Sequence, residues 1–143
     1  MKIAVVCYAN YCRSPVAEII LKSLLPDDWL INSFGLSPFL SSGMDKRSIK
    51  FLEKKGYETL VHTPKRLGLE QVKNYDIIYV LDMRLLFRLN KLYSKYSYKL
   101  KVLNFNDLSL NLSDPYKLND EDYSLIMNNI EKSCFMIEKC INN

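Results

Sequence analysis

The sequence predicts an α/β fold of one domain, in which a four-stranded parallel sheet with strand order 2-1-3-4 carries helices on both faces. The first observation behind this prediction is that short apolar runs alternate with longer segments whose apolar residues recur at helical spacing. Strands that are separated by helices pair in parallel, and the connecting helices cover the sheet. The second observation is that the 143 residues contain no composition break, internal repeat or low-complexity segment. We therefore expect residues 1–143 to form a single domain.

The first half of the chain contains two predicted strands and two predicted helices. Lys2–Val6 is typical of a central, buried strand, and it is followed by a helix near Pro15, because proline is favoured in the first helical turn. Trp29–Ser33 is the second short strand. After a loop that contains glycine and proline, the pattern predicts a helix from Lys46 to Lys55 with Gly56 as its C-cap.

The second half of the chain continues the alternation. Asp76–Leu81 is predicted as the third strand, Arg84–Leu92 as a helix and Lys101–Leu103 as a short fourth strand. Residues 104–119 form a loop, and Asp120–Ile141 is the C-terminal helix. Because ligands of such sheets bind beyond the carboxyl ends of the strands, the end of the first strand is the place to search for a site.

A cysteine and an arginine share the loop that follows the first strand. Six positions separate Cys7 from Arg13, so a curled loop can bring thiolate and guanidinium to the same phosphate-sized anion. Backbone N–H groups would point inward and the positive end of the helix dipole would lie beneath them, which favours the thiolate form of Cys7. Ser14 is placed to donate a hydrogen bond to that sulfur. The alternative is a buried cysteine ending a strand and an exposed arginine starting a helix.

The stretch VVCYANYCRSPVAE resembles the phosphate loop of the low-molecular-weight protein tyrosine phosphatases. A second motif of that family corresponds to Asp114-Pro115-Tyr116. Between the two motifs, residues 32–36, 43–45, 62 and 75–78 occur in the family's order. The resemblance covers nearly the whole chain and looks closest to the short bacterial members associated with capsule and exopolysaccharide gene clusters. It implies a phosphatase that needs no metal and no cofactor. Its substrates would be phosphotyrosine proteins, among them a bacterial tyrosine kinase.

The resemblance also implies a role for each catalytic group. Cys7 would attack phosphorus and form a cysteinyl-phosphate, while the planar fork of Arg13 would hold two phosphate oxygens. Asp114 would protonate the leaving phenolate and then activate water. In isolation, the Asp-Pro-Tyr motif would only indicate a turn.

Four residues match family positions that form a hydrogen-bond network around the phosphate loop: Asn10, Ser14, Ser33 and His62. Asparagine is one of the few residues besides glycine that tolerates a left-handed backbone, which such a loop can require. His62 is the only histidine, and a lone histidine cannot make a metal site. We expect a buried structural hydrogen bond from it rather than a surface position or a catalytic role.

The substrate-binding residues implied by the resemblance lie in the two motifs: Tyr8, Ala9, Asn10, Tyr11, Cys12, Ser14 and Tyr116. The aromatic residues among them, with Phe39 and Leu40, would line a slot deep enough for an aromatic phosphate, although each could equally belong to the core. Ala9 stands where the family usually has glycine. If its φ is positive, the methyl group adds strain of about 1 kcal/mol.

The cysteines separate this family from its relatives. Cys12 lies five residues after Cys7, as in family members whose two loop cysteines join under oxidation, although Cys12 could simply be a packing residue. Arsenate reductases of the same fold need two more cysteines on a central segment, and none lies between Cys12 and Cys134. Cys134 and Cys140 follow the apolar pattern of the last helix and are expected to be buried thiols. The alternative is a phosphotyrosine-binding relative without activity: the presence of Cys7, Arg13 and Asp114 together argues against it, and Ala9 in the loop argues for it.

Composition and charge exclude several other classes. The net charge of +4 is mild and the basic residues are scattered, which argues against nucleic-acid binding. No apolar segment is long enough to insert into a membrane, and the short N-terminal apolar run is unlike a signal peptide. We therefore expect a cytoplasmic protein with reduced cysteines.

Overall fold

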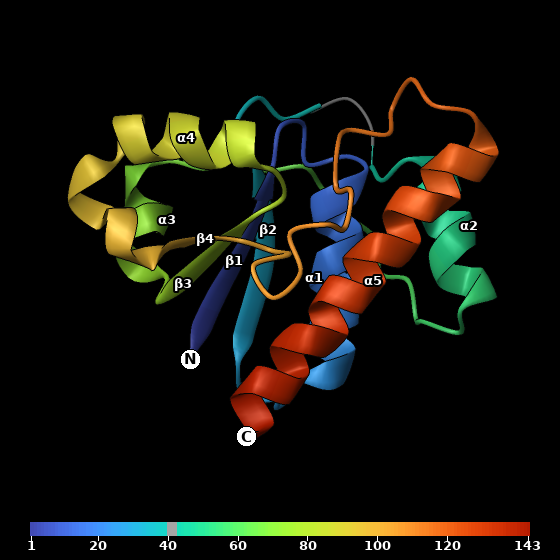
Figure 1. The fold of residues 1–143 in the computed structure, drawn as a ribbon, viewed down its shortest axis with the longest axis horizontal. Helices are drawn as coiled ribbons and strands as arrows, with labels where there is room; N and C mark the ends of the chain where they lie inside the picture. The colour runs from blue at the N-terminus through green and yellow to red at the C-terminus, as the bar shows by residue number, and fades with distance from the viewer. Residues whose placement is uncertain (40–42) are drawn as a thin grey trace.

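The centre of the fold is a parallel β-sheet in a computed structural model that describes residues 1–39 and 43–143 (Figure 1). Within the described residues the sheet has four strands in the order β2-β1-β3-β4, as predicted. The bounds differ from the predicted ones by at most two residues. The strands are β1 (Lys2–Cys7), β2 (Leu30–Gly35), β3 (Ile77–Val80) and β4 (Leu100–Val102).

The helices confirm the predicted alternation and add two short elements to it. None of the helices within 1–39 and 43–143 is long and apolar enough to cross a bilayer. The helical elements are α1 (Arg13–Leu24), α2 (Lys46–Lys54), α3 (Leu69–Asn74), α4 (Met83–Leu92), the 3-10 helix η1 (Ser94–Lys99) and α5 (Asp120–Asn142). The sequence pattern did not predict α3 and η1. Each has six residues, and with one buried residue in α3 and none in η1 neither shows a helical apolar period.

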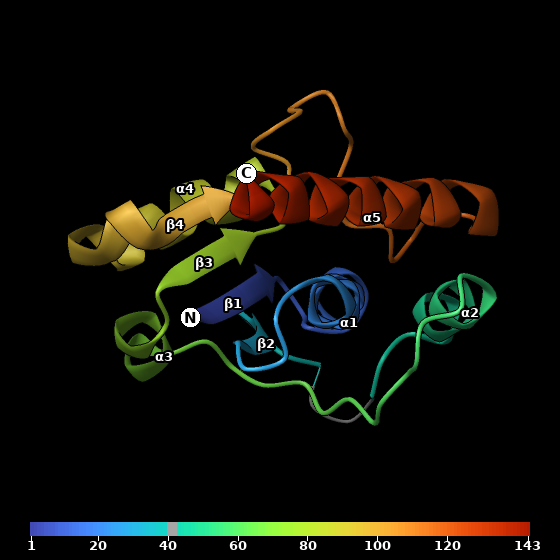
Figure 2. The same ribbon diagram turned by 90° about the horizontal axis from the view of Figure 1, so that it is seen from below.

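Alternation along β1 explains why both faces of the sheet are covered. Ile3, Val5 and Cys7 belong to a core shared with α1 and α5, whereas Ala4 and Val6 belong to a second core shared with α3 and α4. Figure 2 shows these two pairs of helices on opposite sides of the strands, with α2 outside α1 and next to α5. The predicted layers are therefore confirmed, since successive side chains of a strand point to opposite faces.

Aspartates begin two of the helices that border the carboxyl ends of the strands. The Asp45 side chain accepts a hydrogen bond from the Arg47 N–H at 2.8 Å and caps α2. The Asp82 side chain accepts from the Leu85 N–H at 2.9 Å and caps α4. Such caps satisfy backbone donors that have no partner inside the helix, and they fix where each helix starts. Gly56, predicted as a C-cap, follows α2 with a φ of 84°.

The cysteines of the last helix differ in burial. Cys134 is fully buried, as expected for a structural thiol. Cys140 is exposed, which corrects the expectation that both are buried. Cys140 lies in the last turns of α5 (Figure 1), where Ile137 and Ile141, and not Cys140, pack on the core.

Candidate active site

The loop between β1 and α1 brings Cys7 and Arg13 to one pocket of about 220 Å³. Cys7 is the last residue of β1 and Arg13 is the first residue of α1. Among the described residues, Asn10 is the only one besides glycine with a positive φ, at 51°. The left-handed residue of the loop is thus the asparagine that tolerates it. Ala9 does not carry the strain that a positive φ would cause.

Gly35 allows this loop to lie directly on the end of β2. Cys7 pairs with Gly35 in the sheet, and a Cβ atom at Gly35 would lie 2.9 Å from both the Asn10 nitrogen and the Tyr8 oxygen. That separation is shorter than real Cβ contacts, so any side chain here would push the loop away. Sequence reasoning did not assign this role to Gly35, although a glycine at the end of a strand is a known signal of close backbone approach.

The four predicted network residues meet behind the loop. The Asn10 amide Nδ2 donates to Ser14 Oγ at 2.8 Å and to Ser33 Oγ at 3.0 Å, and all three side chains are inaccessible to solvent. Ser14 Oγ lies 2.9 Å from Cys7 Sγ. His62 is half-buried with Nε2 2.7 Å from the Asn10 carbonyl oxygen, so Nε2 must donate. Burial lowers the pKa of His62, which favours the neutral ring.

Arg13 is held in place by an aspartate that the sequence did not reveal. Its guanidinium Nη1 donates to Asp82 Oδ2 at 2.7 Å and to the Leu112 carbonyl oxygen at 2.9 Å, and the residue is 2% exposed. Both of these bonds use Nη1, so the geometry leaves Nε and Nη2 for the pocket. Asp82 is visible in the sequence as a helix cap, but nothing local indicates a partner 69 positions away.

Asp114 reaches the same pocket from the loop before α5. It is exposed, and its Oδ1 accepts from the Tyr116 N–H at 3.1 Å within its own loop. Pro115, the next residue, is buried. The structure therefore brings Asp114 to the pocket of Cys7 and Arg13, which lie 107 and 101 positions earlier in the chain.

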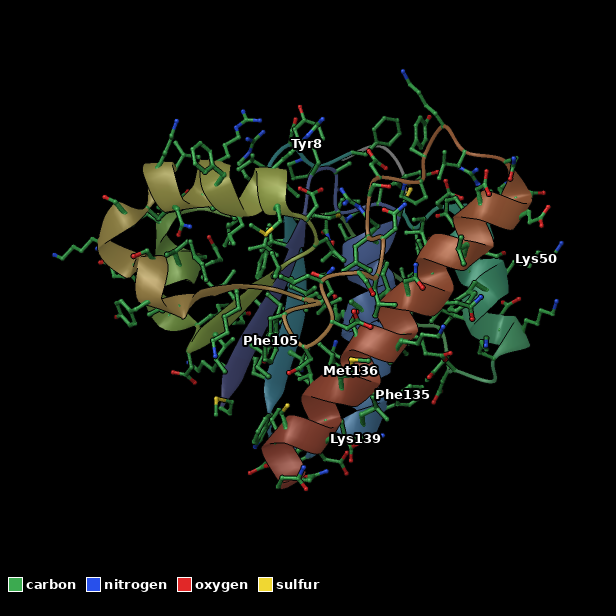
Figure 3. All side chains as sticks on the ribbon, viewed as in Figure 1. Tyr8, Lys50, Phe105, Phe135, Met136 and Lys139 are labelled. Carbon is green, nitrogen blue, oxygen red and sulfur yellow. The ribbon has the colours of Figure 1, made fainter. Side chains whose placement is uncertain are left out.

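Aromatic side chains line the mouth of the pocket. The Tyr11 ring lies 5.2 Å from that of Phe39 and 6.2 Å from that of Tyr116, measured between ring centroids. Tyr8 lines the pocket from the other end of the loop and is 45% exposed; it lies at the upper edge of the molecule in Figure 3. Leu40, also expected to line the slot, falls outside the described residues.

The remaining predicted binding residues divide into two groups. Ala9 and Cys12 line the pocket, whereas Asn10 and Ser14 are not among its lining residues and act from behind the loop. Burial raises the pKa of the Cys12 thiol to about 12, so this thiol is neutral at physiological pH. Its sulfur lies 3.7 Å from Asp45 Oδ2, a second aspartate that the sequence did not mark as part of the site.

Comparisons with known proteins agree with this geometry. A family model described as low molecular weight phosphotyrosine protein phosphatase matches residues 2–143. The chain is 26% identical to the low molecular weight protein-tyrosine-phosphatase Wzb of Escherichia coli (strain K12), over 98% of this chain and 95% of that protein. The crystal structure of the tyrosine phosphatase Wzb from Escherichia coli K30 in complex with sulphate has a TM-score of 0.91 at 25% identity, over 98% and 97% of the two chains.

A further solved structure shares the fold alone. YwlE, an arginine phosphatase, covers all of this chain with a TM-score of 0.89 at 20% identity, and 97% of its own chain is matched. The match to Wzb agrees with the predicted class of bacterial capsule-cluster members. Because the family model spans almost every residue, the chain belongs to the low molecular weight phosphotyrosine protein phosphatase family and is a phosphatase.

Proposed function

We propose that the protein hydrolyses phosphotyrosine in proteins through a cysteinyl-phosphate, with Cys7 as nucleophile, Arg13 as phosphate clamp and Asp114 as general acid and base. The observation that carries this proposal is the single pocket lined by all three side chains. A nucleophile, an anion-binding fork and a proton donor around one phosphate-sized space are the groups that metal-free transfer of a phosphoryl group to sulfur requires.

The hydrogen bonds behind the loop have a direction that favours the thiolate. The Asn10 amide donates to both serine hydroxyls, so Ser14 Oγ accepts there. Its own hydrogen can go to Cys7 Sγ at 2.9 Å, which is nearer than its other acceptor, the Phe34 carbonyl oxygen at 3.5 Å. Ser33 likewise accepts from Asn10 and donates to the Glu18 carboxylate. A hydrogen bond donated to a sulfur stabilises its anion, as does the N-terminus of α1 next to it.

The reaction has two steps in this proposal. The Cys7 thiolate attacks phosphorus while the P–O bond breaks, and Asp114 gives its proton to the departing phenolate oxygen. In the second step Asp114 takes a proton from water as the water oxygen attacks phosphorus, and the P–S bond breaks to restore the thiolate. Nε and Nη2 of Arg13 and the backbone N–H groups of the loop would hold the phosphate oxygens throughout.

The walls of the pocket favour an aromatic phosphate. Tyr8, Tyr11, Phe39 and Tyr116 surround the entrance, and a phosphate on the shorter serine side chain would not reach Cys7 at its base. The class of its relatives suggests a bacterial tyrosine kinase as a protein substrate, and hence action in the cytoplasm.

Four substrates separate this proposal from its alternatives. We expect hydrolysis of a phosphotyrosine peptide in the presence of a chelator, with little hydrolysis of phosphoserine and phosphoarginine peptides and no thiol-dependent reduction of arsenate. Acid quench during turnover of a radiolabelled aryl phosphate should leave the label on the Cys7 peptide. Preference for phosphoarginine, or arsenate reduction at a comparable rate, would overturn the assignment of substrate. Label on another residue would overturn the mechanism.

We propose that Cys12 protects the nucleophile from irreversible oxidation. Cys7 and Cys12 line the same pocket, and the neutral Cys12 thiol is oxidised less readily than a thiolate. We propose that peroxide converts Cys7 to a sulfenic acid, and that Cys12 then forms a disulfide with it while water is released. Peptide mapping should find this disulfide, and Cys12→Ser should change a reversible loss of activity into an irreversible one. If Cys7 is found only as sulfinic or sulfonic acid in the wild type, Cys12 has a packing role.

A further inference from the structure

The first turn of α2 lies between the two loops that form the pocket. On one side it is bonded to the phosphate loop: the Asp45 N–H donates to the Tyr11 carbonyl oxygen at 3.0 Å, and Ser48 Oγ donates to the Cys12 carbonyl oxygen at 2.8 Å. Asp45 and Ser48 are both buried. The start of α2 is therefore fixed relative to the nucleophile.

Arg47, in the same turn, reaches the other loop. Its Nη2 donates to the Tyr116 carbonyl oxygen and its Nη1 to the Leu118 carbonyl oxygen, each at 2.8 Å. The Asp45 carboxylate accepts from Arg47 Nε at 3.3 Å and Nη2 at 3.2 Å, and the guanidinium lies 4.0 Å from the centroid of the buried Tyr123 ring. A planar guanidinium with these partners has one orientation, so the two carbonyl groups are held rigidly.

The loop that carries Asp114 depends on such contacts from outside. Residues 104–119, all of them described, form turns without a helix or strand. The Asp114 carboxylate bonds within its own loop. On either side of Asp114, backbone carbonyls are bound by arginines, Leu112 by Arg13 and Tyr116 by Arg47. Asp114 thus lies on a short span that two guanidinium groups hold.

We propose that Arg47 is a positioning residue for the proton-transfer step, because it sets the place of Asp114 relative to Cys7. This inference rests on the proposed role of Asp114 as the acid. A general acid must come within hydrogen-bonding reach of the leaving oxygen, and a displacement of about 1 Å can cost about 100-fold in rate. The same contacts also support Tyr116, whose ring lies against Tyr11 at the pocket mouth.

The test compares two leaving groups in matched variants. An acid matters most when the leaving group is poor, so kcat/KM is measured for phenyl phosphate and for p-nitrophenyl phosphate. We expect Arg47→Met to lower kcat/KM for phenyl phosphate about 10- to 100-fold and that for p-nitrophenyl phosphate much less. Arg47→Lys keeps the charge without the planar fork, so its kcat/KM for phenyl phosphate should lie between those of the wild type and Arg47→Met. Lys50→Met is the control, because Lys50 extends outward from the same helix and should retain wild-type values for both substrates (Figure 3).

A double variant separates positioning from stability. If Arg47 acts through Asp114, Arg47→Met should add no further loss for phenyl phosphate in an Asp114→Asn background. Equal loss for both leaving groups, or losses that multiply in the double variant, would overturn the proposal. Should Arg47→Met not fold in thermal unfolding measurements, Arg47→Lys decides by the same criterion. If Asp114→Asn itself slows both leaving groups equally, the acid assignment fails, and that outcome differs from failure at Arg47 alone.

Discussion

The two loops of the pocket are stabilised in different ways. The phosphate loop lies between a central strand and a helix, and Asn10, Ser14 and Ser33 behind it are completely buried. Most of the loop of Asp114 is exposed, although Leu112 and Pro115 are buried, and guanidinium groups bind its backbone carbonyls. The nucleophile is thus positioned by the same contacts that stabilise the fold, whereas the acid is positioned by a few contacts outside the core. Changes in the first loop should affect stability and activity together, and changes in the second should affect activity alone.

The largest effects are expected for the two groups that touch the phosphate. Cys7→Ser removes the nucleophile and should lower turnover of aryl phosphates by about 10⁴-fold or more, and Arg13→Ala should cost about 10²- to 10³-fold. Arg13→Ala should also lower stability, because it leaves Asp82 without its buried partner. Steady-state kinetics and urea unfolding measure the two effects. Arg88→Ala, an exposed arginine on α4, is the control, and full activity of Cys7→Ser would refute the mechanism.

Asp114→Asn should separate activity from stability. For phenyl phosphate we expect kcat/KM to fall about 10²- to 10⁴-fold, while the free energy of unfolding stays within about 0.5 kcal/mol of the wild type. Asp107→Asn and Asp120→Asn are the matched controls in the same region. Hydrogen bonds from Ser109 lower the pKa of Asp107, so its carboxyl group is less often protonated and has a proton to give less often. A defect that depends on the leaving group in either control would move the assignment to that residue.

Asn10→Ala tests whether the phosphate loop supports the stability of the fold. The change removes the bonds to two serines and places alanine at a φ of 51°, so we expect a loss of about 2–4 kcal/mol in the free energy of unfolding. Asn10→Gly tolerates this backbone and isolates the contribution of the hydrogen bonds. Urea unfolding provides the values. Stability like that of the wild type in both variants would show that the network does not support the fold.

The smallest expected effect is a pH dependence from His62. Its pKa is lowered in the folded protein, so the unfolded chain takes up the proton first as the pH falls. The stability that neutral His62 contributes is present above the unfolded pKa of about 6.5 and is lost as the pH drops below it. His62→Gln keeps a donor for the Asn10 carbonyl group but does not titrate. Its free energy of unfolding, measured with urea in an assay that covers about pH 7.5 to 5.5, should therefore depend less on pH than that of the wild type. Identical pH dependence in both proteins would exclude this contribution.

The sequence predicted those parts of the site that are local in the chain. Strand β1, the loop and the start of α1 form one continuous pattern, so the positions of Cys7 and Arg13 followed from spacing and helix physics. The second motif needed the resemblance to a family, because Asp-Pro-Tyr alone indicates only a turn. A left-handed backbone at Asn10 was expected because asparagine tolerates it, and Asn10 has a positive φ in the structure.

The missed residues act over long distances in the chain. Asp82 and Asp45 are recognisable as helix caps, but their second roles depend on partners that only the fold brings near. Arg47 has an ordinary place on an amphipathic helix, and its two carbonyl partners lie 69 and 71 positions away. Gly35 is required by an approach of two backbones that depends on the register of β1 and β2. Such contacts leave no period or motif in the sequence.

Asp82 divides its two oxygens between two tasks. Oδ1 begins helix α4, and Oδ2 orients Arg13. Serine, threonine or asparagine would begin the helix equally well, but none of them offers an anion to the guanidinium; glutamate offers the anion but is a poorer cap. No alternative residue meets both demands, so position 82 has little freedom to drift during evolution. A substitution at position 82 should therefore affect the stability of α4 and the orientation of Arg13 together, because one carboxylate serves both.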